Sequence, residues 1–249
     1  MNKIILAFWA AIFLNCAAAK SQTATEMAQQ FLEGMRYGDP AEEQLKRLEM
    51  LTPEKLEKDL PNDDYKKAFW INLYNATVQY LLLEDSTRYG NRDKFFQTRW
   101  IKVAGVDMSL DEMEHGILRR SEIKYGLGYV KNPFVSDFIK RHQVEVKDSR
   151  IHFALNCGAG SCPPISFYSP ENINEELDLS VMGFLKATTS VEGNTVYVTR
   201  LFQWFKGDFG SDECIIKFLK RYDALARGQN PKKIEYLEYD WKLAIGVYE

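Results

Sequence analysis

The chain has 249 residues, of which 45% are hydrophobic and 13% aromatic, and its formal net charge at pH 7 is -3. This composition is typical of a folded globular protein and argues against a disordered chain. The mildly acidic balance argues against nucleic-acid binding, which usually requires a basic surface.

The first residues have the pattern of a secretory signal peptide. The positive charge of Lys3 precedes an uncharged apolar run from Ile4 to Leu14, and the small residues from Ala17 to Ala19 offer a cleavage site. The apolar run is too short for a permanent transmembrane helix. We therefore predict a signal peptide over residues 1–19, and simple cleavage is favoured over lipid attachment at Cys16.

The rest of the chain, residues 20–249, is predicted to be one exported globular domain, periplasmic or secreted. It has no second long apolar run, so we do not expect an integral membrane protein. It keeps three cysteines, Cys157, Cys162 and Cys214, so at least one thiol is unpaired in an oxidising compartment. A bond between Cys157 and Cys162 would close a small, reducible ring.

Three amphipathic helices are predicted first, over residues 24–37, 40–50 and 53–60, because their apolar residues are spaced by three and four. A fourth helix, from Asp63 to Glu84, is apolar nearly all round. Such a helix is expected to lie in the centre of the protein, covered on every side.

Three amide side chains, Asn72, Asn75 and Gln79, follow one stripe of this buried helix. An unsatisfied buried amide costs about 1–3 kcal/mol, so each one requires hydrogen-bond partners. In one interpretation they bind irregular backbone nearby and fix the fold. In the other they line a pocket and orient a catalytic group, which three amides on one stripe favour.

A strand is predicted over Trp100–Val106, followed by the capping-box sequence Ser109–Glu112, which opens a helix that ends near Arg120. Glu114 lies on the apolar face of that helix, where a carboxylate requires pairing or hydrogen bonds. Its neighbour His115 is expected at the boundary between core and solvent. The simplest interpretation is a salt-bridged surface histidine beside a structural glutamate.

The segment Arg150–Pro164 contains a strand pattern that leads into a tight loop. Apolar and polar residues alternate from Ile151 to Asn156, which predicts a half-buried strand. Glycines and a serine follow Cys157, and two prolines follow Cys162. Both thiols are therefore expected in a loop at the end of a buried strand, a common position for active-site residues.

The other elements of the second half follow from the same periodicities and from turn residues. They are a short helix over 133–142 with an exposed His142, a helix within 171–186, a hairpin over 188–199, a helix over 212–227 with a buried Cys214, and a strand over 233–239. Helices precede most strands without regular alternation. The predicted fold class is α+β, predominantly helical with a small, mostly antiparallel sheet.

The best candidate site is a cysteine nucleophile at Cys157. A thiolate requires a base or a positive field; His115 is the best candidate base, and His152 is the runner-up. The backbone N–H of Gly158 follows Cys157 directly and could help to form an oxyanion hole. Three side chains are candidates to orient the imidazole of His115: they are Glu114, Asn72 and Asn75.

Two other chemistries have less support. Four residues have types suitable for zinc: His115, His152, Cys157 and Cys162. The thiols are five residues apart, wider than in common zinc knuckles, and His-Glu-x-x-His is absent. A thioredoxin-like role lacks Cys-x-x-Cys. We therefore predict no metal and no cofactor, and Cys162 is a second reactive thiol, a resolving thiol or an ordinary loop residue.

Four blocks of the sequence resemble the domain of unknown function 547 family. In the order of that family, they are Ala68–Ala76, Glu114–Arg119, His152–Pro164 and Arg200–Phe205. The resemblance extends over about residues 63–222 and implies the family fold. It also implies site positions at Glu114, His115 and Cys157, whereas the position of Cys162 can be serine. Cys157 is therefore favoured as the reactive thiol.

Two functional hypotheses follow. The first is a cysteine-dependent hydrolase or acyltransferase acting on an unknown substrate. Its catalytic residues would be Cys157, His115, Glu114 and Asn75, and its binding residues Asn72, Gly158, Cys162 and Arg200. The second is a non-catalytic envelope binding or scaffolding domain, in which the buried polar residues are structural. In that case the aromatic residues Phe202, Trp204 and Phe205 pack internally or bind a partner.

Overall fold

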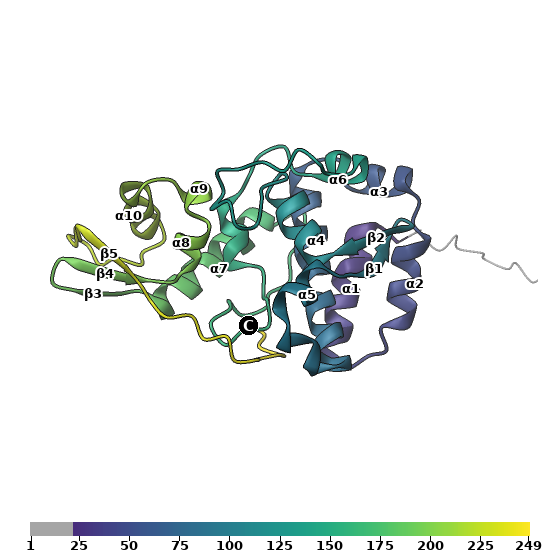
Figure 1. The fold of residues 1–249 in the computed structure, drawn as a ribbon, viewed down its shortest axis with the longest axis horizontal. Coiled ribbons are helices and arrows are strands. Elements are labelled where there is room, and N and C mark those ends of the chain that lie inside the picture. Colours follow the sequence, from purple (N-terminus) through teal and green to yellow (C-terminus); the bar gives the residue numbers. More distant parts are fainter. Residues whose placement is uncertain (1–21) are drawn as a thin grey trace, which may run out of the picture.

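The structure, a computed structural model, describes residues 22–249 (Figure 1), and the predicted signal peptide lies outside them. The fold is α+β and predominantly helical, which confirms the predicted class. The elements, in order, are α1 Ala24–Tyr37, α2 Glu42–Met50, α3 Pro53–Asp59, α4 Asp63–Glu84, η1 Ser86–Gly90, α5 Arg92–Gln97, β1 Arg99–Val103, β2 Val106–Ser109, η2 Glu112–Leu118, α6 Asp137–His142, η3 Ser149–Phe153, α7 Ile173–Thr188, β3 Ser190–Glu192, β4 Thr195–Val198, α8 Leu201–Trp204, α9 Lys206–Phe209, α10 Asp212–Arg221 and β5 Lys233–Tyr236.

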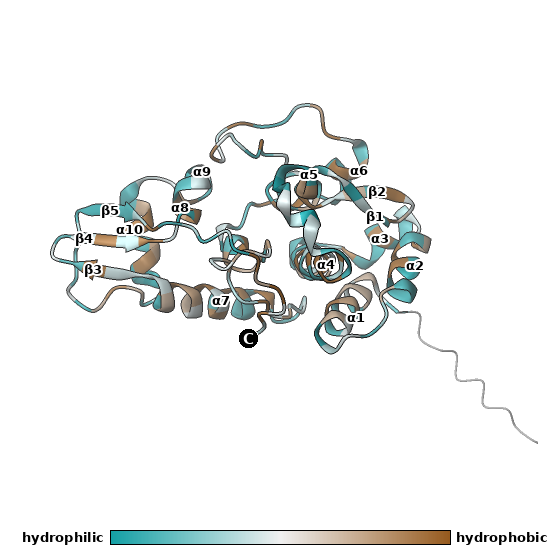
Figure 2. Cartoon of the chain, turned by 60° about the horizontal axis from the view of Figure 1, so that its bottom comes forward, coloured by the Kyte–Doolittle hydropathy of each residue, from teal (hydrophilic) through white to brown (hydrophobic). Residues whose placement is uncertain are grey.

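Helix α4 is the central element, and both of its ends are those predicted from the sequence. Fifteen of its 22 residues are buried, because apolar side chains cover almost its whole circumference. The side chain of Asn62 caps the first turn by accepting hydrogen bonds from the backbone N–H groups of Asp64 and Tyr65. Figure 2 shows α4 nearly end-on, with α1, α3 and α5 arranged around it.

The strands form two small sheets. β1 and β2 pair in antiparallel fashion, as do β3 and β4, and the second pair confirms the predicted hairpin. β5 joins β4 in parallel, so the three-stranded sheet is mixed. These sheets lie in different parts of the molecule, with β1 and β2 beside the helices of the first half (Figure 1).

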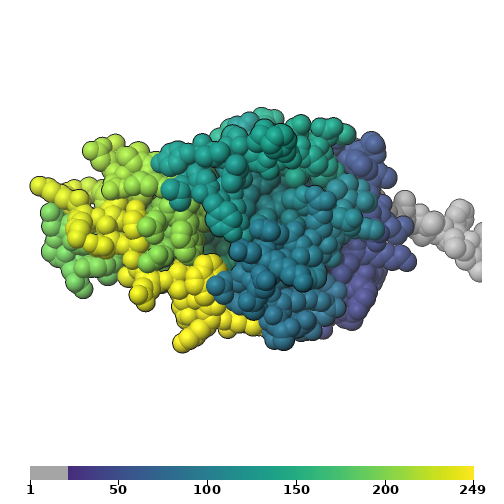
Figure 3. Space-filling model, in the orientation of Figure 1, coloured from purple at the N-terminus to yellow at the C-terminus, as the bar shows by residue number. Residues whose placement is uncertain are grey.

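The buried apolar residues form two clusters. The larger surrounds α4, and the smaller joins α7, β4, α8, α9 and α10. In the smaller cluster the ring centroids of Phe202 and Phe209 lie 4.6 Å apart, and Phe153 contacts both rings. Figure 3 shows a hollow in the surface between the parts of the molecule that contain these two clusters, where teal residues face green and yellow ones.

Two amides of α4 hold the segments that run over it. The side chain of Asn75 donates to Ala154 O and accepts from Asn156 N, both at 2.9 Å. Asn72 makes the same pair of bonds with the backbone of Tyr168, at 2.7 and 3.1 Å. Both amides therefore satisfy buried backbone, and among the described residues no hydrogen bond joins either one to His115.

The predicted strand from Ile151 to Asn156 is wrong. Ser149–Phe153 is a short 3-10 helix, η3, and its first turn is capped by the Asp148 side chain, which accepts from Arg150 N at 3.1 Å. Every residue from 151 to 156 is buried. The alternating pattern therefore did not reflect one covered and one exposed face.

Two side chains have the opposite burial from that predicted. His142 is only 2% exposed: its Nδ1 lies 2.8 Å from Phe138 O, and its ring packs on Phe138, one helical turn away. Cys214 is exposed, in the first turn of α10.

Helix α10 also ends earlier than predicted, at Arg221, because Asp223 has a φ of 53° and leaves the helical conformation.

Replacing Asn75 by Ala is expected to lower the free energy of unfolding by about 2–4 kcal/mol, because two buried backbone groups lose their partners. Urea unfolding followed by circular dichroism measures this change. The matched control is Asn172→Ala, at an exposed position, which should change stability by less than about 0.5 kcal/mol. Equal effects of the two substitutions would contradict the structural role of Asn75.

Candidate active site

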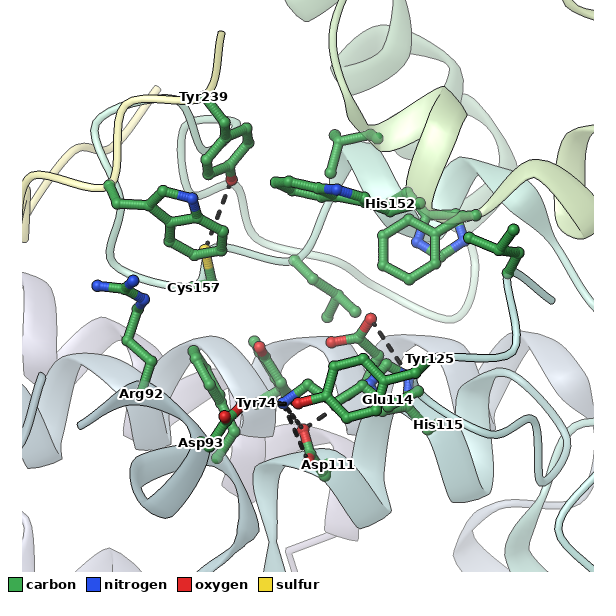
Figure 4. Close-up of a pocket in the computed structure, with 18 of the residues that line it drawn as sticks. Tyr74, Arg92, Asp93, Asp111, Glu114, His115, Tyr125, His152, Cys157 and Tyr239 are labelled. Carbon is green, nitrogen blue, oxygen red and sulfur yellow. Dashed lines mark hydrogen bonds and ion pairs between the residues drawn. The ribbon is translucent and has the colours of Figure 1, made fainter.

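A cavity of about 430 Å³ lies between α4 and η2 on one side and, on the other, the segment that carries Cys157, helix α8 and the chain after β5 (Figure 4). Its wall is mostly apolar, and seven of the residues that line it are aromatic, including Trp204 and Trp241. Figure 4 shows Cys157 on the wall opposite Glu114 and His115. The structure thus brings three predicted catalytic residues to one cavity, although no hydrogen bond joins Cys157 to His115 among the described residues.

Cys157 and Cys162 form a close pair in the segment we call the thiol loop, residues 157–162. Their Sγ atoms lie 2.6 Å apart, and both thiols are free. The backbone N–H of Cys157 donates to Cys162 Sγ at 3.1 Å. The hydroxyl oxygen of Tyr239 lies 3.3 Å from Cys162 Sγ and 3.6 Å from Cys157 Sγ. The pair therefore has a polar environment on the wall of an aromatic cavity.

These contacts affect the two thiols differently. Burial raises the pKa of Cys162, but hydrogen bonds from Cys157 and Tyr239 outweigh burial, and the net pKa is lowered. The pKa of Cys157 is raised well above its ordinary value by its hydrogen bond to Cys162 and by burial. The two thiols titrate as a pair, in which Cys162 carries the negative charge more readily.

The thiol loop packs against α4 at Gly158, where it turns tightly. This residue has a φ of +84°, and a Cβ there would lie 2.7 Å from Leu82 Cδ1, so glycine is strongly favoured. The Gly158 N–H donates to Asn156 Oδ1 at 2.9 Å, and the Asn156 amide donates to Pro163 O at 2.7 Å. The Gly158 N–H therefore already has a buried partner, which does not fit its predicted role in an oxyanion hole.

η2 is a π-helix that carries both Glu114 and His115. It follows the predicted capping box, in which Ser109 and Glu112 exchange side-chain-to-backbone hydrogen bonds of 3.0 and 3.1 Å. Its wide turn is shown by Arg119 N, which donates to Glu114 O, five residues earlier, at 2.8 Å. π-helical turns are rare and frequently lie at functional sites. Here two consecutive side chains reach the same cavity.

His115 is a buried, neutral imidazole rather than the boundary residue predicted. Its Nδ1 lies 2.9 Å from an amino group of Arg119, which can only donate, so Nδ1 accepts. The hydrogen of the neutral ring is then on Nε2, 3.7 Å from Asp111 Oδ1. Burial and the charge of Arg119 hold the pKa of His115 well below its usual range. Its one basic nitrogen is therefore already occupied.

Glu114 has the properties of a proton-transfer group. Only 14% of its side chain is exposed, and Oε1 lies 3.6 Å from His115 Nδ1. Burial raises its pKa to about 7, against the opposing charge of Arg119, and the charges of Asp111 and Cys157 also favour the protonated form. A carboxyl group with a pKa near the ambient pH is suited to general acid–base catalysis.

A buried group of charges lies behind this wall. The carboxylate of Asp208 accepts from Arg119 Nε at 2.7 Å, His152 Nε2 at 2.9 Å and Lys147 Nζ at 2.9 Å. Burial raises the pKa of Asp208, but its partners outweigh burial and hold the pKa far below its usual range. Burial lowers the pKa of His152 to about 4, and its ring stacks on Phe205 at 3.8 Å. His152 is therefore neutral and carries its hydrogen on Nε2.

Some site residues could not be found from the sequence, and five predicted ones do not line the cavity: Asn72, Asn75, Gly158, Cys162 and Arg200. Arg200 donates through Nε to Leu237 O at 3.0 Å and does not line the cavity. Asp208 was detectable only as a lone acid in the aromatic stretch after Arg200. Tyr239, which contacts both thiols, has no sequence signal, because nothing in its local pattern indicates a partner 82 residues away.

Within residues 22–249, no group of three or more His, Cys, Asp and Glu side chains is arranged to hold a metal ion. In the same described part of the chain, no helix is both long enough and apolar enough to cross a membrane.

Comparison with known proteins adds one positive result. The family described as "Protein of unknown function, DUF547" matches residues 48–185. These residues include α4, η2 and the thiol loop, whereas α8 and Tyr239 lie beyond the match. A search of the curated proteins and a search of the solved structures found no match.

The raised pKa of Glu114 predicts a pH-dependent effect of Glu114→Gln on stability. The gap between the ordinary 4.5 and about 7 corresponds to about 3 kcal/mol. Below pH 4.5 the carboxyl is protonated in both states. As the pH rises from 4.5 to 7, the unfolded state ionises while the folded state keeps its proton, so stability is lost over this range and no further above it. Relative to wild type, Glu114→Gln should therefore be more stabilising at pH 8 than at pH 4.5, by up to about 3 kcal/mol.

Urea unfolding at the two pH values measures this difference. Glu175→Gln, at an exposed position, is the control and should show little dependence on pH. If the two variants respond to pH in the same way, the carboxyl of Glu114 does not have the raised pKa assigned to it.

Asp208→Asn is expected to destabilise the protein by about 3–5 kcal/mol, because it leaves the buried Arg119 and the half-buried Lys147 without their counter-charge. The matched control is Asp212→Asn, whose carboxylate pairs with Lys206 at an exposed position and whose loss should cost less than about 1 kcal/mol. Thermal unfolding of both variants tests the comparison, and a small effect at Asp208 would contradict its role in the buried group.

Proposed function

The chain belongs to the DUF547 family, and we propose that it is an exported thiol-dependent acyl hydrolase or acyltransferase with Cys157 as its nucleophile. The observation that carries the proposal is the placement of the paired thiol of Cys157 and the carboxyl of Glu114 on opposite walls of one aromatic cavity (Figure 4). An acyl group held between these walls would meet a nucleophile on one side and a proton donor on the other.

The hydrogen bonds of the site support Cys162 as the base. The acceptor nearest to the Cys157 thiol is Cys162 Sγ, at 2.6 Å, and Cys162 carries negative charge more readily than Cys157. The ionised sulfur of Cys162 lies within reach of the Cys157 proton and can take it as Cys157 bonds to the acyl carbon, since a base must lie within reach of the proton that it removes. This role replaces the one predicted for His115, whose basic nitrogen accepts from Arg119.

In the first half-reaction, Cys157 gives its proton to Cys162 and attacks the acyl carbon, so that a sulfur–carbon bond forms and the carbonyl electron pair moves to oxygen. When this intermediate collapses, the bond to the leaving group breaks and Glu114 gives that group a proton. The product on the enzyme is a thioester at Cys157.

In the second half-reaction, water or another acyl acceptor attacks the thioester and gives a proton to Glu114. The carbon–sulfur bond breaks, and Cys162 returns its proton to Cys157. All groups then have the protonation that they had at the start, so the cycle balances. Neutral donors near the cavity can stabilise the oxyanion. They include the hydroxyl of Tyr74, whose pKa is raised by burial and by the charges of Glu114 and Cys157.

The aromatic wall indicates the kind of group that binds. Trp204, Tyr239 and Trp241 lie in mutual contact, with ring centroids 4.7–5.5 Å apart. Such a surface favours an apolar or flat portion of a substrate. The same surface supports the alternative proposal, a non-catalytic binding domain that holds a ligand without reacting with it. The two proposals differ in whether Cys157 becomes acylated.

Two acetate esters test the enzyme proposal. With p-nitrophenyl acetate, wild-type protein should release a burst of p-nitrophenol, and intact mass spectrometry should show one acetyl group on Cys157. Cys157→Ser should abolish both signals. Cys214→Ser, at an exposed position, is the control and should retain them.

Phenyl acetate has a poorer leaving group and depends more on the acid. Glu114→Gln should therefore lower kcat by about 10²–10⁴-fold with phenyl acetate and by less with p-nitrophenyl acetate. Equal losses with both esters would remove Glu114 from the role of acid. If neither ester acetylates Cys157 in the wild-type protein, the enzyme proposal is wrong and the binding domain is favoured.

A further inference from the structure

The pairing of Cys157 with Cys162 has a second chemical consequence. We propose that the two residues form a reversible dithiol–disulfide site that reacts with low-molecular-weight disulfides such as glutathione disulfide. This reaction is separate from the proposed acyl transfer and does not depend on it, although the two would compete for Cys157.

The geometry of the thiols requires little change for the bond to form. The Sγ atoms are 2.6 Å apart, and a disulfide bond is about 2.05 Å long. Both residues are partly exposed, and Cys157 lines the cavity. A small disulfide could therefore reach the pair.

Backbone contacts hold the thiol loop in the shape that keeps the sulfurs together. Gly160 N donates to Lys242 O, and Ala244 N donates to Gly158 O, both at 2.8 Å. The side-chain oxygen of Ser161 accepts a hydrogen bond from Asp240 N, in the same stretch of chain, residues 240–244. Because the loop is already ordered, closing the ring costs little further conformational entropy.

The hydrogen bonds indicate which thiol reacts first. Cys162 Sγ accepts from the backbone N–H of Cys157 and lies within hydrogen-bond distance of the Tyr239 hydroxyl. Hydrogen bonds to sulfur favour the thiolate, which is the attacking form in thiol–disulfide exchange. The lowered pKa of Cys162 agrees with this order.

The exchange balances in two steps. The Cys162 thiolate attacks one sulfur of glutathione disulfide, the disulfide bond breaks, and one glutathione leaves as a thiolate. Cys157 then loses its proton to that thiolate and attacks Cys162 Sγ, which releases the second glutathione. The protein dithiol gives up two electrons, and glutathione disulfide is reduced to two thiols. Excess reduced glutathione reverses both steps.

The test follows mass rather than activity. Cys214→Ser protein, which keeps only the paired thiols among residues 22–249, is incubated with glutathione disulfide, blocked with N-ethylmaleimide and examined by intact mass spectrometry. The expected product has lost two hydrogens and carries neither glutathione nor N-ethylmaleimide. Dithiothreitol treatment before blocking should restore two N-ethylmaleimide additions.

Two further substitutions in the Cys214→Ser background test the order of attack. Cys157→Ser should accumulate one glutathione on Cys162, because no second thiol can displace it. Tyr239→Phe removes the hydroxyl beside the pair and should slow the reaction at neutral pH several-fold. Circular dichroism establishes that each variant is folded.

The proposal would be overturned if both paired thiols still took up N-ethylmaleimide after long incubation with glutathione disulfide. It would also be overturned if a stable glutathione adduct persisted on Cys162 while Cys157 was present. Either result leaves the ester experiments unaffected. Conversely, a protein that never acetylates Cys157 can still show the loss of two hydrogens, so failure of each proposal is separately visible.

Discussion

The buried carboxylate of Asp208 is the constraint on which the arrangement of the site depends. An unpaired ion in this position would cost several kcal/mol, so the chain must bring Arg119, His152 and Lys147 to it. Arg119 and His152 belong to parts of the chain that build the cavity wall, and Asp208 lies in α9. One ionic requirement thus fixes these segments relative to one another. Through Arg119 it also determines which nitrogen of His115 carries hydrogen.

Burial shifts the pKa values of the acidic and basic groups of the cavity in opposite directions. It favours the uncharged form of both Glu114 and His115, even though one is an acid and the other a base. Cys162 differs because hydrogen bonds to its sulfur outweigh burial. Of the two thiols, Cys162 therefore carries negative charge more readily, while the Glu114 carboxyl can hold a proton across the cavity. Groups whose pKa values are separated in this way can serve as acid and base at one pH.

The sequence was most informative where a property repeats along one element. Both ends of α4, the capping box before η2 and the hairpin of β3 and β4 follow from periodicity and turn residues. The resemblance to family blocks indicated that Glu114 and Cys157 belong to one site, and both line the cavity. The pattern from Ile151 to Asn156 misled because all of its residues are buried. The pairing of Arg119 with Asp208 spans 89 residues, and no local pattern encodes such a contact.

The hydrogen bonds between the thiol loop and residues 240–244 have a consequence for biosynthesis. Until this segment has been synthesised, Gly158 and Gly160 lack their backbone partners. Tyr239 directly precedes the segment and is also among the last residues to be added. A nascent chain that ends before this segment would lack these contacts around Cys157 and Cys162. The Tyr239 hydroxyl that helps to lower the pKa of Cys162 therefore reaches the pair only after residues 239–244 have docked on the thiol loop, late in folding.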